Sequence, residues 1–94
     1  METIKLELAE LQWKSKEEQM CKIVEEFNEV IESFIKKDDV GLKSELMDLI
    51  QSSFTMLNTI SGNVTSENEK HLAKMQKYLQ FGRVEKKRER SMLE

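Results

Sequence analysis

Apolar residues recur at intervals of three and four along three consecutive stretches of this chain, and this period predicts three amphipathic helices. The first stretch begins with Ser15-Lys16-Glu17-Glu18, which has the form of a capping box. Asp38 or Asp39 caps the second, and Ser66-Glu67-Asn68-Glu69 is a capping box for the third. We call the residues expected on the buried face of each helix its apolar line. In the first predicted helix this line is Met20, Ile23, Val24, Phe27, Val30, Ile31 and Phe34; in the second it is Leu42, Leu46, Leu49, Ile50, Ser53, Phe54, Leu57 and Ile60; in the third it is Leu72, Met75 and Leu79.

Glycines punctuate these stretches. All three lie at or just beyond the end of an apolar line, where a left-handed residue ends a helix at low cost. They are Gly41, Gly62 and Gly82. The residues before Ser15 are ambiguous, because their apolar positions fit a helix while Ile4-Lys5-Leu6-Glu7-Leu8 alternates like a strand. We predict a helix there, because an isolated strand would find no partner in this chain.

Composition agrees with a small all-helical protein. The 94 residues contain no proline and are 35% charged and 38% hydrophobic, which is typical of helices rather than of a β-sandwich. We therefore predict one domain over residues 1–94, an all-α antiparallel helical bundle with its core at residues 16–82 and a charged tail at 83–94. A chain of this size covers its apolar surface poorly by itself, so the bundle is expected to be oligomeric.

Charge and cysteine content limit the classes of partner and the cellular location that are expected for this protein. The net charge of −3 argues against a nucleic-acid-binding protein, in which a basic excess is expected. Cys21 is the single cysteine, so no intrachain disulfide forms, and a reducing cytoplasmic location is the simplest interpretation. The sequence near Met1 does not resemble a signal peptide. No apolar run approaches the roughly 20 residues of a membrane span, so no membrane association is expected.

Two pairs of carboxylates stand out on the first two predicted helices. Glu26 and Glu29 share one flank of the first helix, about 60° apart on a helical wheel. Glu45 and Asp48 share a flank of the second helix in the same way. The connecting turn is short, so the helices should run antiparallel, and a turn centre near Asp38–Asp39 puts Glu29 level with Asp48. We expect the four carboxylates to cluster on one side of the hairpin.

Four carboxylates without a cation would repel one another, raise their own pKa values and destabilise the fold. One or two metal ions would offset this repulsion. Mg²⁺, for which Mn²⁺ can substitute, prefers such hard oxygen ligands together with phosphates. The alternative is a solvated acidic face, because acidic residues three apart are common on helices. The pairing of two such faces across a short turn favours the metal site.

The spacing of these carboxylates resembles that of a known enzyme family. The pattern Glu25-Glu26-x-x-Glu29, fifteen residues, then Glu45-x-x-Asp48 is similar to the EExxE and ExxD motifs of the MazG-like all-α nucleoside triphosphate pyrophosphohydrolases, which are related to the dimeric dUTPases. The segments EEFNEVIESFIKKDD and SELMDLIQSSFTML resemble the two motif helices of that family. The resemblance extends over residues 16–82.

The resemblance implies an activity and the residues for it. Members of the family hydrolyse the α–β phosphoanhydride of a nucleoside triphosphate, which releases the monophosphate and pyrophosphate. By resemblance, Glu26, Glu29, Glu45 and Asp48 would hold Mg²⁺, and Glu25 would bind a further ion or orient the attacking water. The substrate would be an NTP or a dNTP, and the protein a homodimer or a homotetramer. No residue indicates which base or sugar is preferred.

Two features of the family differ in this chain. Many members have an asparagine two helical turns after the motif aspartate, where this chain has Thr55. Members often have a Lys-aromatic-x-x-Arg element near the substrate; here Lys77-Tyr78 is followed by Arg83 after a longer spacer. These differences affect the expected substrate contacts and leave the metal ligands unchanged.

Cations on the third helix are candidates for contacting phosphates. Lys74 and Lys77 lie on a basic stripe of this helix, and Arg83 follows its end. The alternative for each lysine is a solvated position balanced by nearby glutamates. The alternative for the whole protein is a non-catalytic helical interaction module with a degenerate MazG-like site. Dependence on Mg²⁺ distinguishes the enzyme from the module.

Overall fold

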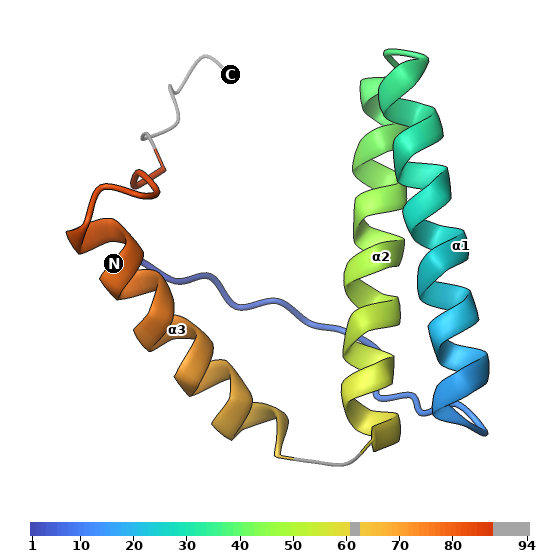
Figure 1. Cartoon of the computed structure of the whole chain (residues 1–94), viewed down its shortest axis with the longest axis horizontal. Coiled ribbons are helices and arrows are strands. Elements are labelled where there is room, and N and C mark those ends of the chain that lie inside the picture. Colours follow the sequence, from blue (N-terminus) through green and yellow to red (C-terminus); the bar gives the residue numbers. More distant parts are fainter. Residues whose placement is uncertain (61–62, 88–94) are drawn as a thin grey trace. The chain divides into compact units, whose positions relative to one another are not determined.

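The computed structural model describes residues 1–60 and 63–87, and the regular secondary structure within them is entirely helical. Helix α1 spans Lys16–Ile35, α2 spans Asp39–Ile60 and α3 spans Val64–Gln80 (Figure 1). The predicted all-α class is therefore confirmed for the described part of the chain. The chain divides into two compact units, one holding α1 and α2 and the other holding α3 with residues 1–5. No helix in the described ranges has the length and apolar character needed to span a membrane.

The ends of α1 are closed by hydrogen bonds that the first capping box predicts in part. The Ser15 hydroxyl accepts a hydrogen bond from the Glu18 backbone N–H at 3.1 Å, which confirms Ser15 as the N-cap. At the other end, Lys37 has a φ of 57° and its N–H donates to the Phe34 carbonyl at 3.1 Å. The Asp38 N–H reaches the Ser33 carbonyl at 3.0 Å. This pair of bonds is a Schellman motif in which a lysine occupies the left-handed position that glycine usually takes.

Asp38 begins α2, and Gly41 lies inside its first turn. The Asp38 carboxylate accepts a hydrogen bond from the Gly41 N–H at 2.9 Å, as expected of an N-cap. The prediction that Gly41 ends a helix is thus wrong. A Cβ at this position would clash with the Asp38 carboxylate, so the glycine allows the cap to approach the backbone.

We predict that Lys37→Gly stabilises the protein by about 1 kcal/mol, because a residue with a Cβ is strained in the left-handed region and glycine is not. Urea unfolding followed by circular dichroism measures the change. The control is Lys36→Gly, because Lys36 has an ordinary helical φ of −75° and should lose stability when replaced. Equal destabilisation by both substitutions would contradict the prediction.

Helix α3 begins one turn earlier than the second capping box predicts. Asn63 is its N-cap and accepts a hydrogen bond from the Ser66 N–H at 3.1 Å. Gly82, with a φ of 71°, closes the helix: its N–H donates to the Leu79 carbonyl, and the Arg83 N–H donates to the Tyr78 carbonyl at 2.8 Å. Gly82 is thereby confirmed as a helix terminator. The corresponding prediction for Gly62, and the part of the predicted tail beyond residue 87, lie outside the described residues.

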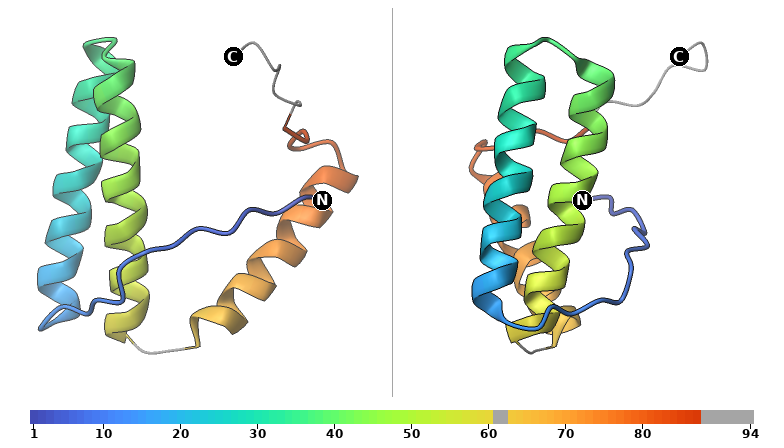
Figure 2. Two further views of the ribbon diagram at one scale, coloured as in Figure 1. Left: turned by 180° about the vertical axis from the view of Figure 1, so that it is seen from behind. Right: turned by 90° about the vertical axis from the view of Figure 1, so that its right-hand side faces the viewer.

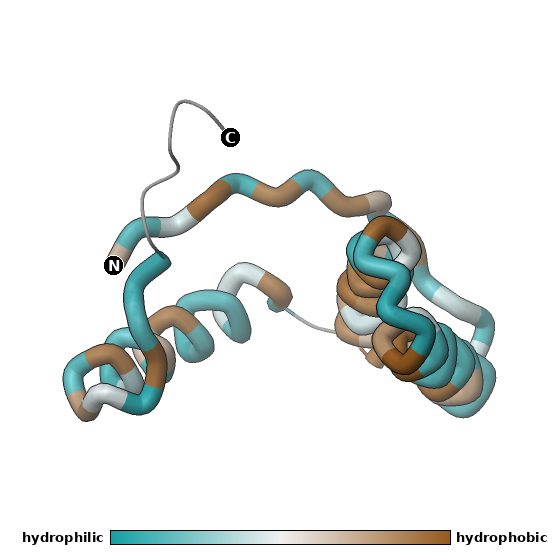
Figure 3. The backbone as a smooth tube through the Cα atoms, turned by 90° about the horizontal axis from the view of Figure 1, so that it is seen from above, coloured by the Kyte–Doolittle hydropathy of each residue, from teal (hydrophilic) through white to brown (hydrophobic). Residues whose placement is uncertain are grey.

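Residues 6–13, here called the arm, form no regular secondary structure, so the predicted N-terminal helix is wrong. Gln51 of α2 makes two bonds with Ala9, accepting from its N–H at 2.9 Å and donating to its carbonyl at 3.0 Å. Further along α2, the Asn58 amide donates to the Leu11 carbonyl, and the Thr59 hydroxyl accepts from the Trp13 N–H. Side chains of a helix thus replace the neighbouring strand that the arm lacks. The alternation of apolar and polar residues in this region is visible in Figure 3.

We predict that Gln51→Leu releases the arm, because it removes both bonds to Ala9, which together contribute about 1–3 kcal/mol. Trp13 is the only tryptophan and lies in the arm, so its fluorescence emission should shift to longer wavelength. The control is Ser53→Ala, because the Ser53 hydroxyl is exposed and bonds only within α2. Unchanged emission, together with unchanged exchange of the Ala9 amide, would refute this assignment of the arm.

The two helices of the hairpin lie side by side (Figure 2), and the fully buried residues among those described are polar. Among the described residues, none of the buried side chains is apolar, and the buried ones are Gln19, Glu26, Ser52 and Thr55. The α1 line that packs on α2 is Gln19, Ile23, Glu26, Val30 and Ser33. The neighbouring line is exposed: Met20, Val24, Phe27, Ile31 and Phe34. The predicted apolar face of α1 is therefore helical in period but is not the face that contacts α2.

Candidate metal centre

Three glutamates of the hairpin converge. Glu26 and Glu29 come from one flank of α1 and Glu45 from α2, and one carboxylate oxygen of each lies within 4.8 Å of the others. Glu26 is buried, and the other two are half-buried. Three of the four carboxylates that the sequence pattern predicts to cluster are thus brought together.

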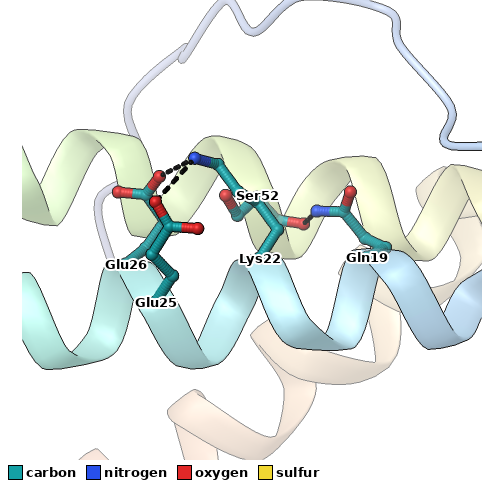
Figure 4. A network of polar contacts seen from close by, with 5 residues as sticks. All are labelled: Gln19, Lys22, Glu25, Glu26 and Ser52. Carbon is teal, nitrogen blue, oxygen red and sulfur yellow. Dashed lines mark hydrogen bonds and ion pairs between the residues drawn. The ribbon is translucent and has the colours of Figure 1, made fainter.

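Gln19 connects α1 to α2 on the same side of the hairpin interface as these glutamates. Its side-chain amide donates a buried hydrogen bond of 2.8 Å to the backbone carbonyl of Ser52, as Figure 4 shows. Gln19 lies two helical turns before Glu26 on α1, and Ser52 lies two turns after Glu45 on α2, so this bond joins the two helices at some distance from the glutamates. Gln19 was not among the predicted site residues. The sequence does mark Gln19 in one way: it is a polar residue with the same helical spacing as Ile23 and Val30, which lie on the line of α1 that packs on α2.

Asp48 is exposed and does not belong to the convergent group of described residues. The structure pairs Glu29 with Glu45, whereas the sequence pattern predicts that Glu29 is level with Asp48. The difference arises because the turn is formed by residues 36–38, earlier than the expected centre at Asp38–Asp39. Asp48 therefore lies about 4.5 Å further along α2 than Glu45.

The convergent carboxylates carry an electrostatic cost. The pKa of Glu29 is raised to about 7, first through its hydrogen bond with Glu45, then through partial burial and the charge of Glu26. One oxygen of Glu26 and one of Glu45, Oε2 in both, is buried without a hydrogen-bond partner. Buried oxygens of this kind are costly unless something binds them. The two oxygens are therefore vacant acceptors in an acidic group.

Lys22 is the cation next to this group. Its ammonium lies 3.0 Å from Glu26 Oε1 and 3.4 Å from Glu25 Oε1, which raises the pKa of Lys22 (Figure 4). Glu25 itself is exposed and outside the convergent group. The helical wheel places Lys22 beside Glu26 and Glu29 but assigns it no role, although a lysine four residues before a glutamate is a recognised ion-pair signal on a helix.

The donor set suits a hard divalent cation. Three carboxylates supply only oxygen ligands, which Mg²⁺ and Mn²⁺ prefer, and the two buried acceptor oxygens are available for coordination. The surrounding hairpin is acidic, with ten Asp and Glu residues against five Lys residues in the range 16–60. A negative potential of this kind attracts cations to the site.

The cations predicted to contact substrate lie in and beyond α3. Lys74 Nζ is 5.6 Å from the centre of the Tyr78 ring, and the Arg83 guanidinium is 4.8 Å from it. Lys77 is exposed in the last turn of the same helix. A pocket of about 480 Å³ within this unit is lined by residues of α3 and both terminal segments, such as Met75, and by none of the convergent glutamates. These cations belong to the other compact unit from the convergent glutamates.

We predict that, through Glu29, the metal-free protein loses stability as the pH rises from 4.5 to about 7. In this range the folded Glu29 holds a proton that the unfolded chain releases, so raising the pH favours unfolding. Urea titrations with EDTA should show that Glu29→Gln removes this decline. Glu32→Gln is the control, because the Lys36 ion pair lowers the pKa of Glu32 and gives it the opposite dependence. Parallel pH profiles for wild type and Glu29→Gln would contradict the prediction.

No family model matches this chain, and neither the curated proteins nor the solved structures include a significant match to it.

Proposed function

We propose that the protein is a Mg²⁺-dependent nucleotide pyrophosphohydrolase that cleaves an NTP or a dNTP to the monophosphate and pyrophosphate. The observation that carries the proposal is the convergence of Glu26, Glu29 and Glu45 around buried oxygens without partners. These three residues occupy the positions at which the chain resembles the MazG-like motif. The group fits a cation in charge, in donor type and in position between two packed helices.

The roles of the residues follow from their positions. Glu26, Glu29 and Glu45 would hold the metal, and Asp48, on the next turn of α2, is the proposed fourth ligand. Glu25 is exposed beside the group and is the proposed residue for orienting the attacking water. When bound, the metal supplies charge to the phosphate oxygens and lowers the pKa of water.

The α3 unit contains the cations that we propose as phosphate contacts. Lys74 and Arg83 are held close to the ring of Tyr78, and Lys77 lies on the same helix. We assign these three residues to the phosphates of the nucleotide, where positive charge offsets the charge of the triphosphate. The ring of Tyr78 would position Lys74 and Arg83. The proposed location is the cytoplasm, where nucleotides and Mg²⁺ are abundant and the single cysteine stays reduced.

A second copy of the chain is the proposed partner of the exposed face of α1. This face is an apolar line with helical spacing over four turns, from Met20 to Phe34, and α2 adds Leu46, Ile50 and Leu57. A second hairpin supplies helices of 20 and 22 residues, and this length matches the exposed line. The resulting homodimer, or a homotetramer of two dimers, is a bundle with apolar contacts between copies.

Pyrophosphate release tests the activity. The full chain is incubated with Mg²⁺ or Mn²⁺ and a panel of NTPs and dNTPs, and phosphate products are separated by ion exchange. Metal-dependent release of pyrophosphate and monophosphate from at least one nucleotide is expected, and EDTA should abolish it. Folded protein that releases neither product from the whole panel would overturn the proposal. The exposed apolar line of α1 would then favour the non-catalytic interaction module.

A further inference from the structure

Lys22 and a metal ion would compete for the same carboxylate. The Lys22 ammonium lies 3.0 Å from Glu26 Oε1, while Glu26 Oε2 is buried without a partner. Only 8% of the Glu26 side chain is exposed, against 42% of the Lys22 side chain. The carboxylate is therefore fixed in the helix interface, and the ammonium reaches it from the solvent side (Figure 4).

We propose that Lys22 is a built-in counter-cation of the carboxylate group, which a divalent cation displaces from Glu26 when it binds. The inference rests on the proposed metal site and adds a residue that regulates its affinity. In the metal-free protein the ammonium partly neutralises the glutamates and lets the hairpin close over them. A metal ion bound to Glu26 and the Lys22 ammonium are both positively charged and repel each other, so Lys22 weakens metal binding.

The structure favours displacement over a fixed ion pair. Lys22 contacts Glu26 at 3.0 Å and the exposed Glu25 at 3.4 Å, so its ammonium retains a partner when it leaves Glu26. A lysine side chain is a flexible four-carbon stem with a compact charge, which allows such a change of partner within one helical turn. The buried Glu26 has no comparable freedom, since its backbone and side chain lie in the α1–α2 interface.

The test compares Mn²⁺ affinity in wild type, Lys22→Met and Lys36→Met, measured by calorimetry and by the EPR signal of free Mn²⁺. Lys36→Met is the matched control, because Lys36 pairs with Glu32 at the same i,i+4 spacing away from the convergent group. We expect Lys22→Met to bind Mn²⁺ about ten-fold more tightly and Lys36→Met to bind it as wild type does.

Stability provides a second measurement. Without metal, Lys22→Met should unfold at a lower temperature than wild type, and saturating Mn²⁺ should raise its melting temperature by more. Lys22→Arg retains the charge and should keep an affinity near that of wild type, which separates the role of charge from any folding defect.

The outcomes are distinguishable. If wild type binds Mn²⁺ and Lys22→Met binds it equally, the counter-cation proposal is overturned and the metal site stands. If neither binds Mn²⁺, both are overturned. Binding by Lys22→Met alone would support both, since it would show that the ammonium excludes the metal.

Discussion

The double variant Glu26→Gln/Glu45→Gln is expected to lose divalent-metal binding and pyrophosphate release together. It removes two of the three convergent carboxylates and both buried oxygens that lack a partner. Changes to outer-shell partners of metal ligands typically cost about 10–100-fold in affinity or activity, so the loss of two direct ligands should exceed about a hundredfold. Calorimetry with Mn²⁺ and the pyrophosphate assay measure the two losses.

The stability of the double variant, measured with and without metal, shows whether the loss of activity comes from the loss of metal binding. Without metal, the double variant should be more stable than wild type, because like charges no longer meet across the hairpin. With Mg²⁺, the order should reverse, because only wild type gains free energy from binding. Glu32→Gln, which changes an exposed carboxylate outside the group, should resemble wild type in both conditions. A double variant that keeps its response to Mg²⁺ would sink the metal assignment.

The second large effect is expected at the outward line of α1. In Val24→Glu/Ile31→Glu, two carboxylates enter the middle of the face that the second copy is proposed to cover. Burying unpaired charges in an apolar interface is strongly unfavourable, so the dimer should dissociate, with the dissociation constant rising more than about a hundredfold. Light scattering after size-exclusion chromatography gives the mass, and circular dichroism reports whether the released hairpin stays helical.

Asn28→Glu is the control for this experiment, because Asn28 is exposed on the same helix but does not lie on the apolar line. It should leave the mass unchanged. A wild type of monomeric mass would overturn the proposed interface between copies. Equal masses for wild type and the double variant would show that the outward line is not an interface between copies.

Local signals predicted much of this structure. The helical period located all three helices, and the side-chain oxygens of Ser15 and Asp38 act as caps because each accepts a hydrogen bond from a free N–H of the first turn. The same logic failed at Lys37, where the local Schellman bonds hold a lysine in a conformation that the sequence pattern would assign to glycine. Helix caps and the helical spacing of apolar residues depend on residues close in the sequence, so they can be predicted from the sequence alone.

Choices between neighbouring faces were harder to predict. Two adjacent lines of α1 contain apolar residues, and the polar members Gln19 and Glu26 of one line decide the packing only through partners on α2. The register of the hairpin depends on which residues form the turn, here residues 36–38, and no helical period reveals this. Asp48 was assigned to the cluster on an alignment that differs from the observed one by about one helical turn.

The arm has a consequence for the order in which the protein acquires its structure. Its residues are synthesised before the helix that binds them, since the bonds from α2 to the arm join positions 42 to 47 residues apart. The α1–α2 turn, by contrast, is closed by residues only a few positions apart. During synthesis on the ribosome, α1 can become helical before Asn58 and Thr59, which bind the arm, have emerged. Docking of the arm is therefore expected to be a late step, completed after the hairpin that receives it.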